Sequence, residues 1–271
     1  MIAATELARG GGSGPAAALP WPLPLGSLVP AARAWELEIG FGKGRYLLAR
    51  AAAEPDRGFV GIEIASEYFR ETARRAARRR LDNLLLLRGE ALYLLATALP
   101  AAFAETVHVY FPDPWPKAHH QRRRLLSPEA LDLVVGALVP GGRLLFATDH
   151  PGYGEAVEEL LAGARGLAVR RWPEGWPEGP RTNYEAKYVA AGRPILRLEL
   201  GLADERARAP HPAALPALAA ATGTGEGGAP ARHRCGGCAG CSPPSARTGG
   251  GWRSGSRRSS SRWRSGSSRR S

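Results

Sequence analysis

A carboxylate set between prolines is the part of this sequence best suited to chemistry. Asp113 lies in the stretch Phe-Pro-Asp-Pro-Trp-Pro-Lys, which ends at Lys117 and follows the apolar run Thr106–Tyr110. Because prolines disfavour both helix and sheet pairing, we expect the chain to leave that run as a rigid turn. The turn would present the carboxylate at the carboxyl end of a buried strand, where open α/β sheets bind their ligands.

A basic block follows this turn at once, and its side chains are suited to phosphates. The candidate RNA-binding residues are His119, His120, Gln121, Arg122, Arg123 and Arg124. A carboxylate beside a phosphate-binding segment predicts chemistry on a nucleic acid, with Asp113 as the candidate catalytic residue. Two alternatives stay open, because basic runs are often solvated helix faces and aspartate is common in plain turns.

A glycine-rich turn forms the second candidate site. Glu38-Ile-Gly40-Phe-Gly42-Lys-Gly44 ends an apolar run and opens a helical pattern. Glycines permit a tight turn and close approach of a ligand, which is typical of a nucleotide-cofactor site. The dinucleotide fingerprint would need glycine where Arg45 stands. The pattern instead resembles S-adenosylmethionine-dependent methyltransferases, whose cofactor carries a sulfonium and an α-amino group that suit a nearby acid.

Three more acidic residues end predicted strands. Glu63 lies 23 residues beyond Gly40, an offset at which an acid can accept both ribose hydroxyls of a cofactor. Glu90 is a candidate contact to the adenine, or alternatively a helix-starting acid favoured by the helix dipole. Asp149 ends a later strand and is expected to face the same cleft.

Alternating strands and helices must position these groups. Strands are predicted at Trp35–Ile39, Gly58–Ile62, Leu84–Leu87, Thr106–Tyr110, Arg143–Thr148, Leu167–Arg171 and Ile195–Leu200. Helical patterns lie between them, at 44–53, 66–80, 91–98, 127–138 and 154–164. This alternation predicts an α/β fold with a doubly wound, mostly parallel sheet. The last two strands are expected to form an antiparallel pair at one edge.

The flanking segments differ in composition from this domain, which spans residues 34–202. Residues 1–33 are rich in Gly, Ala and Pro and are expected to be poorly ordered. Residues 203–271 are rich in Arg, Gly, Ser and Pro and carry +9 of the net charge of +12. Such a segment cannot bury enough apolar surface to order itself, so it is predicted to be a disordered tail. The folded domain is only mildly basic.

All three cysteines, Cys235, Cys238 and Cys241, lie in that tail. A zinc site normally uses two separated ligand pairs, so no metal site is predicted. A folded domain without cysteine fits a reducing cytoplasm and excludes a cysteine nucleophile. The sequence shows neither a run of about 18 apolar residues nor a long apolar segment near its start, so neither a membrane span nor a secretory signal is expected.

Several elements together resemble the bacterial tRNA (guanine-N7-)-methyltransferase family. They are LEIGFGKG, GIE, FPDPWPK with the His/Arg block, ATDH and TNYE-x-K, in order from about residue 35 to 200. The resemblance implies a Rossmann-like methyltransferase fold, S-adenosylmethionine as cofactor and tRNA as partner. It also implies methylation of guanine N7 in the variable loop, at position 46 of the tRNA.

The resemblance further implies roles for individual residues. Glu38, Glu63 and Asp113 would line the cofactor site, with the three glycines of the turn. The substrate contacts would be Lys117, Asp149, Thr182, Asn183, Tyr184 and Glu185. Polar and aromatic groups after a Pro/Gly-rich loop suit recognition of a base, although a structural capping turn is the alternative. Members often carry Asp or Asn where this chain has the longer Glu90.

Two other function classes remain open at this point. A methyltransferase acting on a small molecule or a protein would keep the glycine turn and Glu63 but would not need the basic block. A non-catalytic RNA-binding protein of the same fold would not need Glu38, Glu63 and Asp113. The salt dependence of binding separates the first class, and cofactor affinity separates the second.

Overall fold

The computed structural model describes residues 6–9, 12–14, 20–115, 117, 119, 123–164 and 166–202. The predicted tail at 203–271, with its cysteines, lies outside the described residues. None of the helices in the described ranges is long and apolar enough to cross a membrane.

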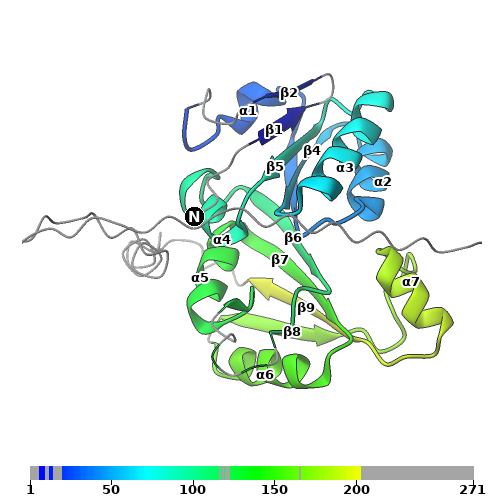
Figure 1. Cartoon of the computed structure of the whole chain (residues 1–271). Helices are drawn as coiled ribbons and strands as arrows, with labels where there is room; N and C mark the ends of the chain where they lie inside the picture. Colours follow the sequence, from blue (N-terminus) through cyan, green and yellow to red (C-terminus); the bar gives the residue numbers. More distant parts are fainter. Residues whose placement is uncertain are drawn as a thin grey trace, which may run out of the picture. The chain divides into compact units, whose positions relative to one another are not determined.

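The described strands form a nine-stranded sheet in the order β2-β1-β5-β4-β3-β6-β7-β9-β8 (Figure 1). From β5 through β4, β3 and β6 to β7, each strand runs parallel to the next. At one edge β1 is antiparallel to both β5 and β2, and at the other β9 is antiparallel to both β7 and β8. The predicted doubly wound sheet with an antiparallel edge is therefore confirmed. The bounds are β1 (Glu6–Arg9), β2 (Gly12–Gly14), β3 (Ala34–Ile39), β4 (Arg57–Glu63), β5 (Leu84–Arg88), β6 (Ala104–Tyr110), β7 (Leu138–Thr148), β8 (Leu167–Arg171) and β9 (Leu196–Leu202).

Helices lie on both faces of this sheet (Figure 1). One face carries α4 (Ala91–Thr97), α5 (Pro128–Gly136) and α6 (Pro151–Ala162), and the other carries α2 (Arg45–Ala53) and α3 (Ser66–Arg78). Local sequence explains where some of them begin. Pro128 starts α5 directly after Ser127, whose hydroxyl accepts from the Ala130 amide at 3.3 Å, because proline fits the first turn and serine caps it.

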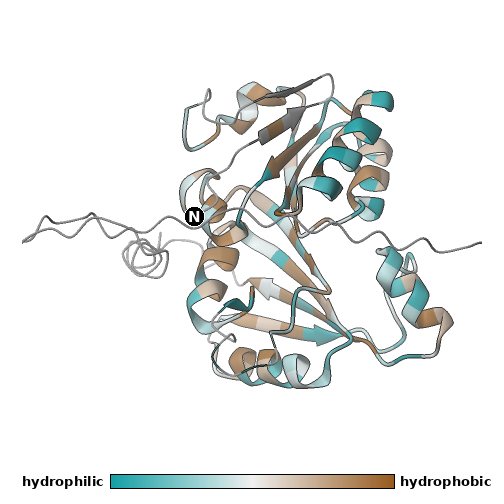
Figure 2. Cartoon of the chain, in the orientation of Figure 1, coloured by the Kyte–Doolittle hydropathy of each residue, from teal (hydrophilic) through white to brown (hydrophobic). Residues whose placement is uncertain are grey.

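The core follows from alternation along the strands. In β3, Leu37 and Ile39 pack into the larger apolar cluster, while Phe59 of β4 packs on the opposite side with α2 and α3. In α3 the buried residues are Phe69, Thr72 and Ala76, spaced by three and four positions, as expected for a helix with one apolar face. Figure 2 shows apolar residues concentrated along the strands and polar residues dominating α3.

Residues 1–33 were expected to be poorly ordered, yet β1 and β2 lie among them and β1 pairs with β5 of the sheet. Residues 20–33 differ from the expectation as well. They contain α1 (Leu25–Leu28), and Leu23, Leu25 and Val29 are buried in the larger core cluster. The Leu23 amide donates to the Ala98 carbonyl at 2.7 Å. The frequent prolines and glycines masked these apolar anchors, because no regular period links them.

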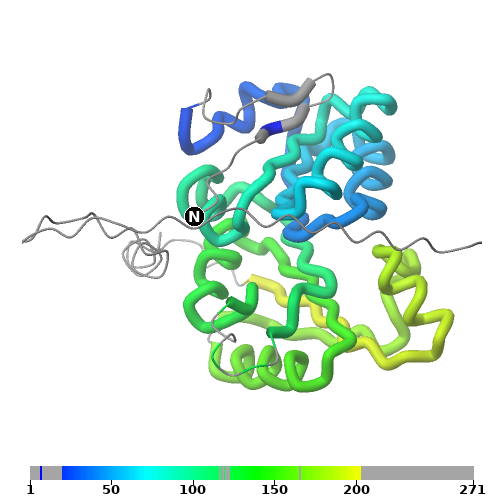
Figure 3. Tube along the Cα trace, viewed as in Figure 1, coloured from blue at the N-terminus to red at the C-terminus, as the bar shows by residue number. Residues whose placement is uncertain are grey.

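A further helix, α7 (Asn183–Ala190), forms in a stretch interpreted from sequence as a loop. Figure 3 follows the chain as it leaves β8, forms α7 beside the sheet and returns as β9. The excursion carries the TNYE element away from the strands and beside the ends of β6 and α2. The candidate site elements from the sequence, namely the glycine turn, the Asp113 turn and the TNYE element, therefore lie at the same side of the sheet.

Candidate functional site

The glycine turn between β3 and α2 has the backbone of a ligand cradle. Gly40, Gly42 and Gly44 have φ angles of 74°, 51° and 62°, a left-handed region that favours glycine. A Cβ added at Gly40 or Gly42 would meet no atom within 4 Å. At Gly44 it would lie 2.5 Å from Thr72 Cγ2, so that glycine packs the turn against α3 while the other two border open space.

Glu63 at the end of β4 holds this turn in shape. Its Oε2 accepts from the Gly42 amide at 2.8 Å, and its Oε1 accepts from the Ala65 amide at 2.9 Å. The residue is buried, with 7% of its surface exposed. Each carboxylate oxygen has a second lone pair, so Glu63 can accept from a ligand hydroxyl while it orders the turn.

Glu38 at the end of β3 is the buried acid that lacks a full set of partners. It is 3% exposed, and its Oε2 has no hydrogen-bond partner among the described residues. Burial raises the pKa of Glu38 to about 8, against the opposing effect of a hydrogen bond from the Leu47 backbone. An unpartnered buried carboxylate is costly unless a cation or donor joins it.

These three features fit S-adenosylmethionine. The open backbone at Gly40 and Gly42 leaves room for a ligand, and Glu63 offers acceptors for ribose hydroxyls. The free Oε2 of Glu38 suits the cationic α-amino group, because an adjacent cation favours the charged form of a carboxyl. Within the described residues, no group of three or more His, Cys, Asp or Glu is arranged to hold a metal ion.

Glu90 has a structural role that accounts for both of its oxygens. As the N-cap of α4 it accepts from the Leu92 amide at 3.1 Å and from the Tyr93 amide at 2.7 Å. Of its two interpretations from sequence, the helix-starting acid is the one for which contacts are seen. Its two oxygens therefore satisfy two amides of the first turn of α4, as a capping side chain does.

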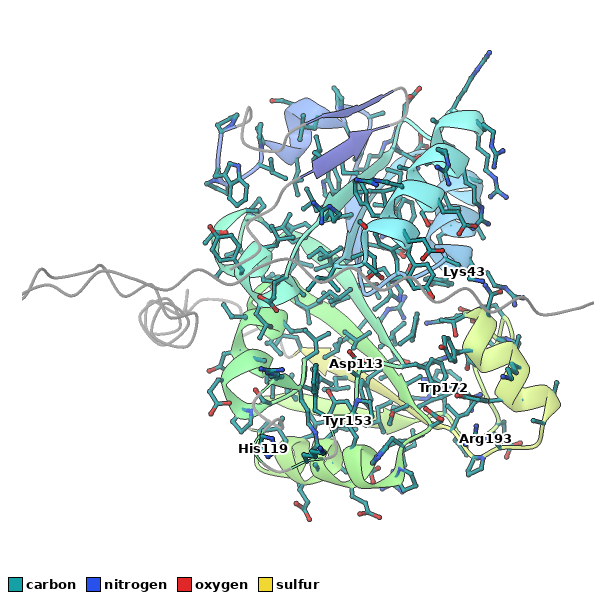
Figure 4. The ribbon with its side chains drawn as sticks, viewed as in Figure 1. Lys43, Asp113, His119, Tyr153, Trp172 and Arg193 are labelled. Atoms are coloured by element: carbon teal, nitrogen blue, oxygen red, sulfur yellow. The ribbon has the colours of Figure 1, made fainter. Side chains whose placement is uncertain are left out.

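The turn that carries Asp113 is held in an unusual backbone conformation. Phe111 and Trp115 have φ angles of 52° and 41°, which cost a residue other than glycine about 1–3 kcal/mol. The Phe111 amide donates to the Ala147 carbonyl of β7 at 2.8 Å. Asp113 lies between them and is exposed, so the turn presents its carboxylate at the carboxyl end of β6, as predicted (Figure 4).

Arg124 supports this turn from below. It is only 7% exposed, its Nε donates to the Pro114 carbonyl at 2.7 Å, and its guanidinium lies 4.8 Å from the centroid of the Tyr153 ring. The sequence interpretation grouped Arg124 with the RNA-binding residues. We reassign Arg124 to positioning the turn, because its guanidinium is buried against the protein and is not accessible to an RNA phosphate.

The rest of the basic block is only partly described. Lys117, His119 and Arg123 are exposed, and the Arg123 guanidinium lies 5.1 Å from the centroid of the Trp115 ring. Figure 4 places His119 on the α6 side of Asp113. The other predicted RNA contacts, at His120, Gln121 and Arg122, lie outside the described residues. Exposed cations thus follow the turn, and their contact with RNA remains a prediction.

The TNYE element caps the start of α7, with Thr182 as the N-cap. The Thr182 hydroxyl accepts from the Glu185 amide at 3.0 Å, and Glu185 Oε2 accepts from the Arg181 amide at 2.8 Å. The other oxygen of Glu185 accepts from Arg197 Nε at 2.6 Å, and this ion pair is buried. Asn183 and Tyr184, between the two capping residues, are exposed. The structure therefore splits the element into two supports and two outward-facing side chains.

Arg181 links this segment to the strands and was not predicted as a site residue. Its guanidinium donates to the Tyr110 hydroxyl at 2.5 Å and stacks over the Trp176 ring at 4.3 Å from the centroid. The Tyr110 hydroxyl in turn lies 2.9 Å from His108 Nδ1, and His108 Nε2 lies 3.0 Å from Glu36 Oε2. A polar chain therefore runs beneath the site from the β3 acid Glu36 to the α7 segment.

The protonation pattern of this chain follows from burial. Desolvation lowers the pKa of His108, so the ring is neutral at pH 7. The pKa of Glu36 is lowered to about 2, because hydrogen bonds from His108 and Arg50, together with the charge of Arg50, outweigh its own burial. The neutral ring then donates through Nε2 to Glu36 and accepts at Nδ1 from Tyr110. The sequence signal for this buried polar chain was His108 itself, a polar residue inside an otherwise apolar strand.

Asp149 reaches the same sheet edge as Asp113. Tyr110 of β6 is paired with Ala147 of β7, so the residues that follow these two lie side by side. The next residue, His150, caps α6, and its Nδ1 accepts from the Tyr153 amide at 3.2 Å. Asp149 itself is half-buried, which is compatible with its predicted contact to a substrate.

Comparison with known proteins adds to this geometry. Residues 32–198 match a sequence family described as “Putative methyltransferase”. A tRNA (guanine-N(7)-)-methyltransferase of Nocardia farcinica is 41% identical over 177 residues, which are 61% of this chain and 66% of that protein. One of Anaeromyxobacter dehalogenans is 42% identical over 168 residues, which are 61% of this chain and 84% of that protein. The chain thus spans about two thirds or more of these relatives.

Solved structures show the same fold at lower identity. A 16S rRNA (adenine(1408)-N(1))-methyltransferase from Catenulisporales acidiphilia, with cosubstrate SAM, is 20% identical, with a TM-score of 0.52 over 77% of this chain and 100% of that chain. The 16S rRNA methyltransferase KamB is 18% identical, with a TM-score of 0.53 over 73% of this chain and 99% of that chain. These likenesses support the methyltransferase fold.

Proposed function

The chain belongs to the bacterial tRNA (guanine-N7-)-methyltransferase family of S-adenosylmethionine-dependent enzymes, and on that premise we propose that it methylates N7 of a tRNA guanosine in the variable loop, at position 46. The observation that supports the proposal most is that two acids, Glu38 and Asp113, lie at the carboxyl ends of the neighbouring strands β3 and β6. Glu38 is buried with one oxygen free beside the glycine turn, and Asp113 is exposed on the next rigid turn. We place this activity in the cytoplasm.

The main requirement of this reaction is that guanine N7 be held in line with the methyl group and the sulfur of the cofactor. When bound, S-adenosylmethionine supplies an electrophilic methyl group on a sulfonium. Guanine N7 carries an in-plane lone pair and needs no deprotonation, so no general base is required. Holding the two reactants in line can supply most of the rate. In that transfer the N7–methyl bond would form as the sulfur–methyl bond breaks, and positive charge would develop on the guanine ring.

Each acid has a distinct part in that alignment. Glu38 would hold the α-amino group of the cofactor, and Glu63, which keeps the glycine turn in shape, would accept from the ribose. Asp113 accepts hydrogen bonds from the cofactor amine or from guanine N1–H and N2–H, and its charge stabilises the cation that forms on the ring. Asp149 and Lys117 are the other proposed contacts to the tRNA substrate.

The test is direct. The full-length protein is incubated with methyl-labelled S-adenosylmethionine and bulk tRNA, and the labelled nucleoside is identified after digestion. We expect 7-methylguanosine as the labelled product. Label on another nucleoside, or on protein or small molecules only, would contradict the proposal.

Removal of the Glu63 carboxylate is expected to weaken cofactor binding selectively. In Glu63→Ala the amides of Gly42 and Ala65 lose their acceptor, and the ribose loses its own. Affinity for S-adenosylhomocysteine should fall by about 1.5–3 kcal/mol, the range for hydrogen bonds to a charged group. Calorimetric titration measures this. Glu90→Ala is the matched control: it should cost helix stability of about 1 kcal/mol and leave affinity unchanged, and equal losses in both variants would contradict the assignment.

The raised pKa of Glu38 predicts proton release on cofactor binding. With a pKa of about 8 the free carboxyl is protonated at pH 6–7, whereas a bound ammonium favours the carboxylate. Affinity for S-adenosylhomocysteine should therefore rise between pH 6 and pH 8, by up to about tenfold per pH unit, and level off above pH 8. Calorimetry in buffers of different ionisation enthalpy counts the proton. A wild-type affinity equal at pH 6 and pH 8, or matching that of Glu38→Gln, would disprove the linkage.

Neutralising Lys117 and Arg123 together is expected to flatten the salt dependence of tRNA binding. Both are exposed beyond the Asp113 turn, and each lost phosphate contact should reduce the log–log slope by about 0.7–0.9. The control is Arg74→Ala with Arg78→Ala, which removes the same charge from an exposed part of α3. Identical slopes in the two double variants would mean that the basic block is a solvated face.

A further inference from the structure

Three aromatic rings form a cluster beside the Asp113 turn, which we call the aromatic platform: Phe111, Tyr184 and Tyr188. The Phe111 and Tyr184 rings are stacked, with centroids 6.4 Å apart and planes inclined by 26°. The centroid of the Tyr188 ring lies 5.9 Å from that of Phe111 and 5.9 Å from that of Tyr184. Residues far apart in the chain, at the end of β6 and in α7, thus meet on one surface.

The platform exposes one ring, Tyr184, which rests on the half-buried Phe111 and Tyr188. Tyr184 is 62% exposed, although its ring rests against Phe111. Its backbone lies in the first turn of α7, between the N-cap Thr182 and the buried Glu185. Phe111 is fixed by its left-handed backbone and by the hydrogen bond that its amide donates to the Ala147 carbonyl of β7. A large apolar ring held in place in solvent loses little entropy when a planar ligand covers it.

The surroundings specify a nucleotide as that ligand. Asp113 follows Phe111 by two residues, in the proline-bound turn, so an acceptor for N–H groups lies beside the platform. The guanidinium of Arg193 lies over the Tyr188 ring, 4.5 Å from its centroid, and Arg193 is exposed. A base face, a base-edge acceptor and a phosphate-binding cation are the three groups that single-stranded RNA requires.

We propose that Tyr184, backed by Phe111, stacks on the methyl-acceptor guanine of the tRNA. This inference rests on the proposed function and deepens it, because the guanine becomes cationic during transfer. The face of an aromatic ring attracts a cation, so the stack strengthens as the positive charge develops. An interaction that is stronger in the transition state accelerates the chemical step as well as binding.

The test compares Tyr184→Phe with Tyr184→Leu. Phenylalanine keeps the aromatic face, whereas leucine keeps only an apolar side chain on an exposed position that tolerates either. We expect Tyr184→Phe to retain wild-type kcat/KM for tRNA within about twofold. We expect Tyr184→Leu to lose about 5- to 150-fold in kcat/KM, the range for one base–aromatic stack, with part of the loss in the single-turnover rate at saturating tRNA.

The controls separate this inference from the proposed function. Val189→Ala changes another exposed apolar residue of α7, 49% exposed, and should leave kcat/KM unchanged. Affinity for S-adenosylhomocysteine should be the same in all variants. If the wild type forms 7-methylguanosine but Tyr184→Leu matches Tyr184→Phe, the stack is refuted while the function stands. A parallel fall in cofactor affinity would also refute it, and absence of 7-methylguanosine from the wild type would refute the function itself.

Discussion

Asp113→Ala is expected to lower the rate of methyl transfer by about 10²–10³-fold, the usual cost of removing one preorganised electrostatic contact. The carboxylate stands on a turn that two left-handed residues and Arg124 hold in place, so its position needs no adjustment during the reaction. Water would replace it without a fixed orientation. Single-turnover kinetics at saturating cofactor and tRNA measure the loss.

Two comparisons make that result specific. Asp56→Ala removes an exposed carboxylate just before β4, at the other edge of the sheet, and should retain full activity. Thermal melting of Asp113→Ala should match the wild type, because the exposed carboxylate is not part of the core. Near-normal turnover by a well-folded Asp113→Ala protein would remove Asp113 from the catalytic site.

Glu185→Ala is expected to lower the free energy of unfolding by about 3–5 kcal/mol, the usual cost of breaking one side of a buried ion pair. Both oxygens of Glu185 accept hydrogen bonds inside the protein, from Arg197 and from the Arg181 amide. Its loss would leave the Arg197 guanidinium buried without its partner. Urea denaturation followed by circular dichroism measures the difference.

The neighbouring residue supplies the control. Asn183→Ala changes an exposed side chain of the same element and should alter stability by no more than about 0.5 kcal/mol. If Glu185→Ala instead keeps wild-type stability and loses tRNA methylation alone, Glu185 contacts the substrate and its structural assignment is wrong. The pair of variants thus separates the two roles of the TNYE element.

The sequence predicted the sheet well because the parallel strands are short apolar runs with few alternatives. Trp35–Ile39 and Leu84–Leu87 each fall within one residue of the strands found. It did not predict α7, whose eight residues follow a Pro/Gly-rich loop. The signal was present, because Thr182 and Glu185 have the spacing of a capping box. The alternative interpretation of this element as a structural capping turn is the one for which contacts are seen.

The candidate site divides along similar lines. The glycine turn and the acids at strand ends could be placed from local sequence, since strand ends of a parallel sheet meet at one edge. Contacts between distant residues could not: His108 and Glu36 are 72 positions apart, and nothing local pairs Arg124 with Tyr153. Neither the buried support by Arg124 nor the aromatic platform has a signature in any single segment.

The most direct test of the account uses one tRNA with a single altered atom. A transcript is prepared with guanosine at position 46, and a second carries 7-deazaguanosine there, which keeps the pairing edge but lacks the N7 lone pair. Methyl transfer from labelled S-adenosylmethionine to the two is compared. The account predicts stoichiometric labelling of the first transcript and none of the second. Equal labelling of both would show that the protein methylates a different atom or a different nucleoside.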